Sequence, residues 1–339
     1  MLTDMKLKTT NESSDVILTP RIIGIDWYRL YITVLVLISF VGVVGNLLVI
    51  GAILINIRLR KLSSALIVNL AISDLLVTGI AVPFAIVGVV NREFLYRHTA
   101  LCDALGSLSV TACCCSIWTI AAISVDRYVH ICHPKTAIRL CSRQQAPFLL
   151  AGTWTLGFAV DMPNFLGWGA HRFDAIGLNC SYHILRFEYT IYICTLGAIV
   201  PMLIIANCYI RIYRAVKKSN RRLKGHKHGL YDTRCQEMQT FKAICTILVV
   251  FSITWTPYLL YSLFGQFYGT WPRWLLMTSN ALGISNSSLN CLIYGLMNKQ
   301  FRDGYVMCLR KFFVWDSTQK HGASLHKGYS IYFFINCVD

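Results

Sequence analysis

Residues Cys102–His133 read CDALGSLSVTACCCSIWTIAAISVDRYVHICH, a long apolar stretch that ends in Asp126-Arg127-Tyr128 and a few more residues. About 30 residues of helix are ~45 Å long at ~1.5 Å per residue, which is enough to cross a bilayer obliquely. The acid, the arginine and the tyrosine follow where hydrocarbon gives way to water, so a charge pair there forms and breaks at modest cost. The stretch predicts a membrane-spanning helix with a polar switch at one end.

The whole chain has the composition of an integral membrane protein. Of its 339 residues, 55% are hydrophobic and 14% are charged, and the mean hydropathy is +0.52. The formal net charge of +16 comes from basic residues that cluster between apolar blocks, as topology signals and leaflet-binding residues do. This placement argues against a nucleic-acid-binding protein. Residues 1–26 lack the apolar core of a cleavable signal peptide.

Seven apolar blocks have about the length that a spanning helix needs. Basic residues are densest in three of the connections and after the seventh block, so positive-inside bias places the N-terminus outside and the C-terminus inside. The short connections leave no room for a soluble domain. We expect an all-α membrane protein, a seven-transmembrane helix bundle with blocks at 28–56, 64–90, 101–133, 147–169, 187–213, 240–267 and 273–297.

The chain on either side of this 28–297 bundle also carries signals. In the expected extracellular tail, residues 1–27, Asn11 begins a glycosylation acceptor, Asn-Glu-Ser. Residues 298–314 carry aromatic and basic residues at helical spacing, which favours an amphipathic eighth helix on the inner leaflet. Within it, Cys308 is a candidate for palmitoylation, with an unmodified thiol as the alternative. Residues 315–339 form a cytoplasmic tail.

The fourteen cysteines do not indicate a metal site or a disulfide framework, because most lie inside apolar blocks and the sequence has no two C-x-x-C motifs that could together bind a metal ion. Two differ from the rest. Cys102 lies at the mouth of the third block and Cys180 in a polar loop, and both face the oxidising side in the expected topology.

Polar residues inside the blocks predict a second feature. Asp74 lies in mid-membrane, where an ionisable side chain needs a partner. Convergence of polar groups on it would make an oxygen cage suited to a sodium ion, the alternative being a hydrated cluster without an ion. The candidate members are Asn46, Ser116, Asn286 and Asn290.

One marker in every block carries a resemblance to a known family. The chain resembles the rhodopsin-like (class A) G-protein-coupled receptors over nearly all of residues 25–315. Each marker is weak alone, but all seven occur in order and at the right spacing. They are Gly45-Asn46, Leu70-Ala71-x-x-Asp74, Cys102 with Asp126-Arg127-Tyr128, Trp154, Pro201 with Tyr209, Trp255-Thr256-Pro257-Tyr258 and Asn290-x-x-x-Tyr294.

The resemblance implies roles for these residues. Arg127 would pair with Asp126 and with Glu237 at rest, and on opening would meet Tyr209 and a G protein; the alternative for Glu237 is a solvated loop acid. Tyr128, Asn290 and Tyr294 belong to the same switch. Trp255 would lie beneath the ligand, Pro257 would kink its helix, and Cys102 and Cys180 would form the extracellular disulfide.

The seventh block narrows the resemblance to melatonin-type receptors, which likewise have no proline after the asparagine equivalent to Asn290. In that subfamily the asparagine that corresponds to Asn164 binds the ligand, and the aromatic residue that corresponds to Tyr182 stacks on the ligand. Two departures put melatonin itself in doubt: Gly197 replaces a histidine, and Ile184 replaces a glutamine.

Two other positions exclude particular classes of ligand. Ser109 replaces the aspartate of amine receptors, and Ile284 replaces the retinal-binding lysine of opsins. A small, largely neutral aromatic or lipid-like ligand fits the aromatic residues that remain, although helix packing is the alternative for each of them. The expected ligand residues are Asn164, Tyr182, Trp255, Tyr258 and Ser109, beside a wider aromatic wall of Trp168, Tyr261 and Phe264.

The sequence therefore predicts a plasma-membrane receptor that couples a small extracellular ligand to a heterotrimeric G protein of the inhibitory class, with arrestin and membrane lipids as further partners. Alternatives are an orphan or lipid-sensing receptor of the same fold and, from another class, a transporter or channel. Ionisable groups do not line a pore, and no inverted repeat is apparent. The sequence contains no H-E-x-x-H or G-x-S-x-G motif, so we expect no catalytic activity and no cofactor apart from the sodium ion.

Overall fold

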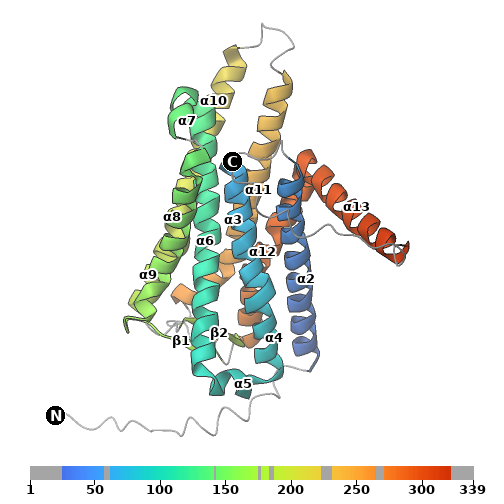
Figure 1. Cartoon of the computed structure of the whole chain (residues 1–339). Coiled ribbons are helices and arrows are strands. Elements are labelled where there is room, and N and C mark those ends of the chain that lie inside the picture. Colours follow the sequence, from blue (N-terminus) through green and yellow to red (C-terminus); the bar gives the residue numbers. More distant parts are fainter. Residues whose placement is uncertain are drawn as a thin grey trace, which may run out of the picture.

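The computed structural model describes residues 25–56, 62–140, 143–174, 177–182, 187–222, 231–264 and 271–321, with the backbone alone at 25–26, 138–140, 143, 219–222, 231–244 and 312–321. Seven long helices run through these residues (Figure 1). They are α2 (Ile25–Ile55), α3 with η2 and α4 (Leu62–Leu76, Val77–Ala81, Val82–Val90), α6 (Thr99–Cys132), α8 (Ala146–Asp161), α9 with η5 and α10 (Phe187–Cys194, Thr195–Ile199, Val200–Arg222), α11 (Tyr231–Phe264) and α12 (Arg273–Met297).

Shorter elements connect the long helices. They are α5 (Arg92–Arg97), α7 (Pro134–Leu140), the 3-10 turns η3 (Arg143–Gln145) and η4 (Met162–Asn164), and the strands β1 (His171–Asp174) and β2 (Asn179–Tyr182). The strands pair antiparallel, with Phe173 opposite Cys180. We call the end of the bundle with α5 and these strands the hairpin end, and the opposite end the Arg127 end. A last helix, α13 (Lys299–His321), leaves the bundle beside α2.

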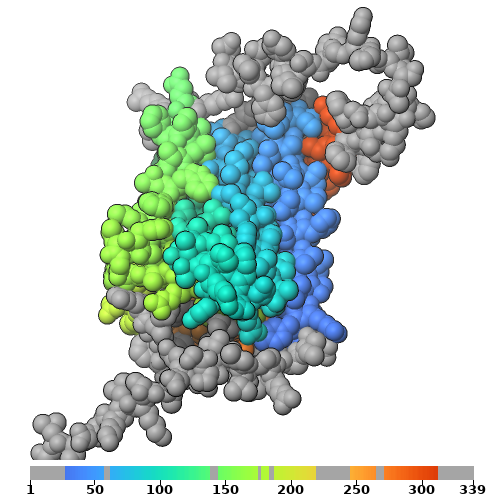
Figure 2. Space-filling model, turned by 60° about the horizontal axis from the view of Figure 1, so that its bottom comes forward, coloured from blue at the N-terminus to red at the C-terminus, as the bar shows by residue number. Residues whose placement is uncertain are grey.

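Helix α6 is the centre of the bundle. It packs against α3, α8 and α10 along its length and lies against both strands at the hairpin end. In Figure 2 the helices from α2 to α8 form one continuous surface, without a gap between them. The largest cluster of buried apolar side chains takes residues from α2, α3, α6, α10, α11, α12 and α13, and it fills the half of the bundle towards the Arg127 end.

Prolines set the irregular turns of the long helices. A proline removes a backbone donor and clashes with the carbonyl four residues earlier, and a π-turn is one adjustment that accommodates it. The π-turn η2 precedes Pro83, where the N–H of Val82 donates to the carbonyl of Val77. The π-turn η5 likewise precedes Pro201. Pro257 lies inside α11.

Five of the helical stretches are long and apolar enough to cross a membrane by themselves: Trp27–Ile55, Leu62–Val90, Thr99–Cys132, Phe187–Lys218 and Cys245–Phe264. Helix α8 has only 16 residues. Helix α12 has 25 residues, but it turns several serines and asparagines into the bundle interior, which lowers its hydropathy. The seven-helix bundle expected from the sequence is confirmed by this fold.

The helix boundaries depart from the expected blocks at three helix ends. The fourth helix ends at Asp161 rather than near residue 169, because Pro163 cannot continue it and a turn with Gly167 at φ 80° follows. The fifth and sixth helices run to Arg222 and from Tyr231, well past the apolar blocks, since a helix continues into water without an apolar surface.

Candidate functional site

A cavity opens on the bundle side of β2, between α6, α9, η5, α11 and α12. It holds about 800 Å³ of empty space when the solvent at its mouth is included. The described residues that line it carry no formal charge. They are Ser109, Val110, Cys113, Cys114, Asn179, Cys180, Ser181, Tyr182, Ile193, Cys194, Gly197, Ala198, Phe251, Trp255, Tyr258, Leu259, Asn280, Gly283 and Ile284.

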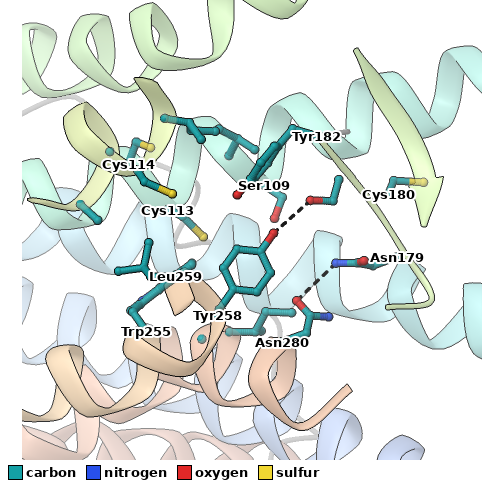
Figure 3. Close-up of a pocket in the computed structure, with 18 of the residues that line it drawn as sticks. Ser109, Cys113, Cys114, Asn179, Cys180, Tyr182, Trp255, Tyr258, Leu259 and Asn280 are labelled. Carbon is teal, nitrogen blue, oxygen red and sulfur yellow. Dashed lines mark hydrogen bonds between the residues drawn. The ribbon is translucent and has the colours of Figure 1, made fainter. Parts of the chain in front are cut away.

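The cavity has an apolar floor, at its end deep in the bundle, and a polar roof, at the hairpin end. Trp255 forms the floor with Phe251, whose ring stacks on it with centroids 5.8 Å apart. At the roof, Ser181 and the Tyr258 hydroxyl lie 3.5 Å apart, and Asn179 donates to Asn280 Oδ1 over 3.4 Å (Figure 3). Both contacts are long for hydrogen bonds, so these groups retain capacity for a polar ligand.

Four of the five expected ligand residues line this cavity: Ser109, Tyr182, Trp255 and Tyr258. The Tyr182 hydroxyl donates to Ser262 Oγ at 3.2 Å, which fixes its ring on the wall. Trp168, Tyr261 and Phe264 of the wider aromatic wall are not among the described residues that line this cavity. Trp168, for example, packs edge-on against Tyr189, as the alternative of helix packing predicted.

Asn164 lies outside the cavity, because other polar groups engage it. Its amide nitrogen lies 3.0 Å from Asp161 Oδ1, 2.6 Å from the Tyr189 hydroxyl and 3.2 Å from His171 Nε2. His171 Nε2 also contacts Asp161 Oδ1 at 2.9 Å, and both side chains are almost fully buried. Ser107 donates to the other Asp161 oxygen. Sequence reasoning missed this cluster, although an acid inside the fourth apolar block was a signal for it.

Asp74 is the centre of a second polar cluster, in the middle of the bundle. Ser116 donates to its Oδ1 at 3.2 Å, and Asn290 to its Oδ2 at 2.9 Å. The Oδ1 atoms of Asn286 and Asn290 are buried and have no hydrogen-bond partner among the described residues. Asn46 does not join; it donates instead to the carbonyls of Gly42 and Ser287.

The chemistry of these groups suits a small cation. A carboxylate, a hydroxyl and two amide oxygens without donors are the oxygen ligands that hard cations prefer, and buried polar atoms normally have a partner. No cluster of three or more His, Cys, Asp or Glu side chains suited to a metal occurs in the described part of the chain.

The Arg127 end differs from the resting arrangement that the resemblance implied. Asp126 and Arg127 form no ion pair in the described structure; the Asp126 carboxylate contacts His130 Nδ1 at 3.3 Å, and Arg127 donates to Ser63 Oγ at 2.7 Å. The reason is geometric, since His130 lies one turn after Asp126 on the same face and Arg127 points round the helix towards α3. The Glu237 side chain lies outside the described residues.

Three tyrosines surround this end. The Tyr128 hydroxyl lies 3.0 Å from His133 Nε2, on the exposed side of α6. Tyr209 and Tyr294 are buried in the large apolar cluster. Tyr294 stacks on Phe301 of α13 with centroids 5.3 Å apart, which ties the end of α12 to that helix.

The two special cysteines form the disulfide that the resemblance implied: Cys102 at the start of α6 is bonded to Cys180 of β2. The thiol of Cys308 on α13 faces α2, because a Cβ placed on Gly51 would lie only 2.9 Å from its Sγ. Burial raises the pKa of this thiol. Asn11 lies outside the described residues.

Comparisons with known proteins agree with this geometry. The sequence pattern of the family described as 7 transmembrane receptor (rhodopsin family) matches residues 45–294. The chain therefore belongs to the rhodopsin family of seven-transmembrane receptors, which are receptors and not enzymes.

Within that family the chain is similar to melatonin receptors. It is 31% identical to melatonin receptor type 1A of Mus musculus, over 85% of this chain and 83% of the relative. It is 30% identical to melatonin receptor type 1B of Rattus norvegicus, over 80% and 76%. Melanopsin of Homo sapiens is 28% identical, over 80% and 59%. The crystal structure of squid rhodopsin shares the fold, with a TM-score of 0.76 at 21% identity, over 90% and 94%.

Proposed function

We propose that this receptor resides in the plasma membrane and binds a small, largely neutral extracellular ligand, aromatic or lipid-like, in the cavity below the hairpin. Ligand binding then activates a heterotrimeric G protein at the Arg127 end. The observation that carries the proposal is the cavity itself, with an apolar floor at Trp255, a polar roof at Asn280 and no charged residue among its described lining. The hairpin end faces outside in this proposal, as the positive-inside bias requires.

The chemistry of the lining favours a neutral ligand over a charged one. A protonated amine taken from water into this cavity would meet no carboxylate, and an unpaired buried charge is costly. An aromatic or alkyl body suits the floor, while an amide or hydroxyl group suits the roof. Melatonin, an indole with an amide side chain, is therefore a suitable probe. An orphan or lipid-sensing receptor of the same fold is the alternative.

We assign the Arg127 end to the partner side. The basic residues Arg211, Arg214 and Lys217 lie in the second half of α10, and the Arg211 guanidinium is 5.9 Å from the ring centroid of Tyr128; these residues suit an acidic partner surface. The similarity to melatonin receptors favours a G protein of the inhibitory class, with arrestin as a second partner. In the middle of the bundle, Asp74, Ser116, Asn286 and Asn290 would hold a sodium ion as an allosteric modulator.

The test is G-protein activation in cells that express the native chain or a variant with a filled cavity. Gly283 borders Trp255, so Gly283→Leu places a side chain in the cavity. The matched control is Gly152→Leu, because a Cβ there meets nothing within 4 Å. Any response of the native chain to melatonin should be retained in the control and lost in Gly283→Leu.

Other ligand classes give distinct outcomes in the same cells. A response to a long-chain fatty acid alone, again lost in Gly283→Leu, would favour the lipid-sensing alternative. A response to serotonin alone would contradict the neutral cavity, since serotonin is a protonated amine. Solute or ion flux without any G-protein signal would indicate a transporter or channel instead.

A further inference from the structure

His130 is placed to hold the Asp126 carboxylate. Its Nδ1 lies 2.9 Å from the backbone carbonyl oxygen of Asp126 and 3.3 Å from Oδ1 of the same residue. Both neighbours are hydrogen-bond acceptors, so Nδ1 must carry the proton. The side chain is 45% exposed, which leaves the rest of the ring in contact with solvent.

Asp126 needs such a partner. Its side chain is 5% exposed, and a buried carboxylate without a positive or donor group nearby is unfavourable. His130 is the basic side chain that lies within 4.0 Å of this carboxylate in the described part of the chain. Oδ1 accepts no well-aligned hydrogen bond there, so its contact with the Nδ1–H group of His130 is a bent one.

Arg127, in turn, does not contact the Asp126 carboxylate. One terminal nitrogen donates to Ser63 Oγ, while Nε is buried without an acceptor among the described residues. A guanidinium group has five donors and keeps its charge, so this arrangement leaves most of its hydrogen-bonding capacity unused. It is therefore ready for an acceptor supplied by another molecule.

We propose that His130 positions Arg127 by occupying the Asp126 carboxylate that would otherwise hold it. This inference rests on the proposed function, in which a G protein meets Arg127. By replacing the Arg127–Asp126 contact, His130 lowers the free-energy difference between the resting and released arrangements, so the unliganded chain spends more time with Arg127 released. His130 acts through Asp126 and is a positioning residue.

The experiment compares His130→Leu, which removes the donor, with His130→Gln, which retains one. His98→Leu, at the exposed start of α6 at the hairpin end, is the matched control. Two readouts are taken without ligand: G-protein activation in cells at equal surface expression, and the distance between dyes on non-natural amino acids at positions 135 and 239 of the purified chain.

We expect His130→Leu to lower basal activation by roughly two- to fivefold, the scale of a half-exposed polar contact, and to shift the dye distance towards the arrangement in which Asp126 holds Arg127. His130→Gln should restore part of both signals, and His98→Leu should change neither. In an Asp126→Asn background, where the carboxylate is gone, His130→Leu should have no further effect.

The outcomes separate this inference from the proposed function. Basal activation that depends on Arg127 but is unchanged in His130→Leu would overturn the inference and leave the function standing. A dye distance that shifts in His130→Leu, in a chain that activates no G protein, would support the inference and count against the function. An equal effect of His130→Leu with and without the Asp126 carboxylate would show a general structural role and overturn the inference.

Discussion

At the scale of single residues, three buried acids of this chain have three kinds of partner. Asp74 accepts from a serine and an asparagine, Asp126 contacts a half-exposed histidine, and Asp161 contacts a buried histidine. A carboxylate inside a helix bundle is unfavourable unless donors surround it, so Asp74 ties α3 to α6 and α12, Asp161 ties α8 to β1, and Asp126 is held within α6.

The Asp161 cluster should contribute to stability as one unit. Asp161→Ala would leave His171 and Asn164 buried without their shared acceptor, which we expect to lower the free energy of unfolding by about 3 kcal/mol. Thermal unfolding of the purified chain measures the change. His171→Ala should cost a similar amount, and the double variant little more than either. Fully additive losses would contradict a shared network.

The Asp74 cluster should bind sodium. Sodium chloride should raise the melting temperature of the native chain by a few degrees over potassium chloride at equal concentration, because a ligand stabilises the folded state that binds it. Asp74→Asn keeps the shape but removes the charge, and it should abolish the difference. Equal melting temperatures of the native chain in both salts would indicate the hydrated cluster without an ion.

Single residues were predictable from the sequence where a motif fixed their place in a helix. Ser109, Trp255 and Tyr258 were placed on the cavity wall because they lie on helices whose register the markers define. Asn164 was not, because its side chain turns towards Asp161, and a contact between the fourth helix and a loop leaves no periodic signal. The contact between His130 and Asp126 was not predicted either, since a single histidine in a basic segment has no distinctive pattern.

At the scale of elements, apolar length predicted the helices well and their ends poorly. Helix α11 begins at Tyr231, about nine residues before its apolar block, because hydrogen bonds rather than hydropathy continue a helix into water. The hairpin of β1 and β2 was not predicted, since strands of four residues are too short for a clear alternation.

The contact between α13 and α2 depends on small residues. A Cβ on Gly304 would lie 2.6 Å from the Cβ of Ala52, so the two helices approach as closely as a glycine permits. Gly304→Leu should separate them and lower the free energy of unfolding by about 1–3 kcal/mol, the usual cost of overpacking. Val306→Leu, at an exposed position of α13, is the matched control. Equal melting temperatures for Gly304→Leu and the control would show that the contact is dispensable.

At the scale of the whole molecule, α6 joins the two ends of the receptor. Its first half supplies Ser109, Cys113 and Cys114 to the cavity, and its last turns carry Asp126 and Arg127. Trp255 on α11 lies beneath the cavity and packs on Phe251, which belongs to the same apolar cluster as Tyr209 and Tyr294. Packed side chains that have two arrangements can couple such distant sites.

The most direct test of this account is G-protein activation by the native chain and by Arg127→Ala, measured in cells at equal surface expression without added ligand and with melatonin. We predict basal activation by the native chain that Arg127→Ala reduces to the level of untransfected cells, with any melatonin response lost as well. Activation that persists undiminished in Arg127→Ala would contradict the central claim that Arg127 transmits the signal from this bundle to its partner.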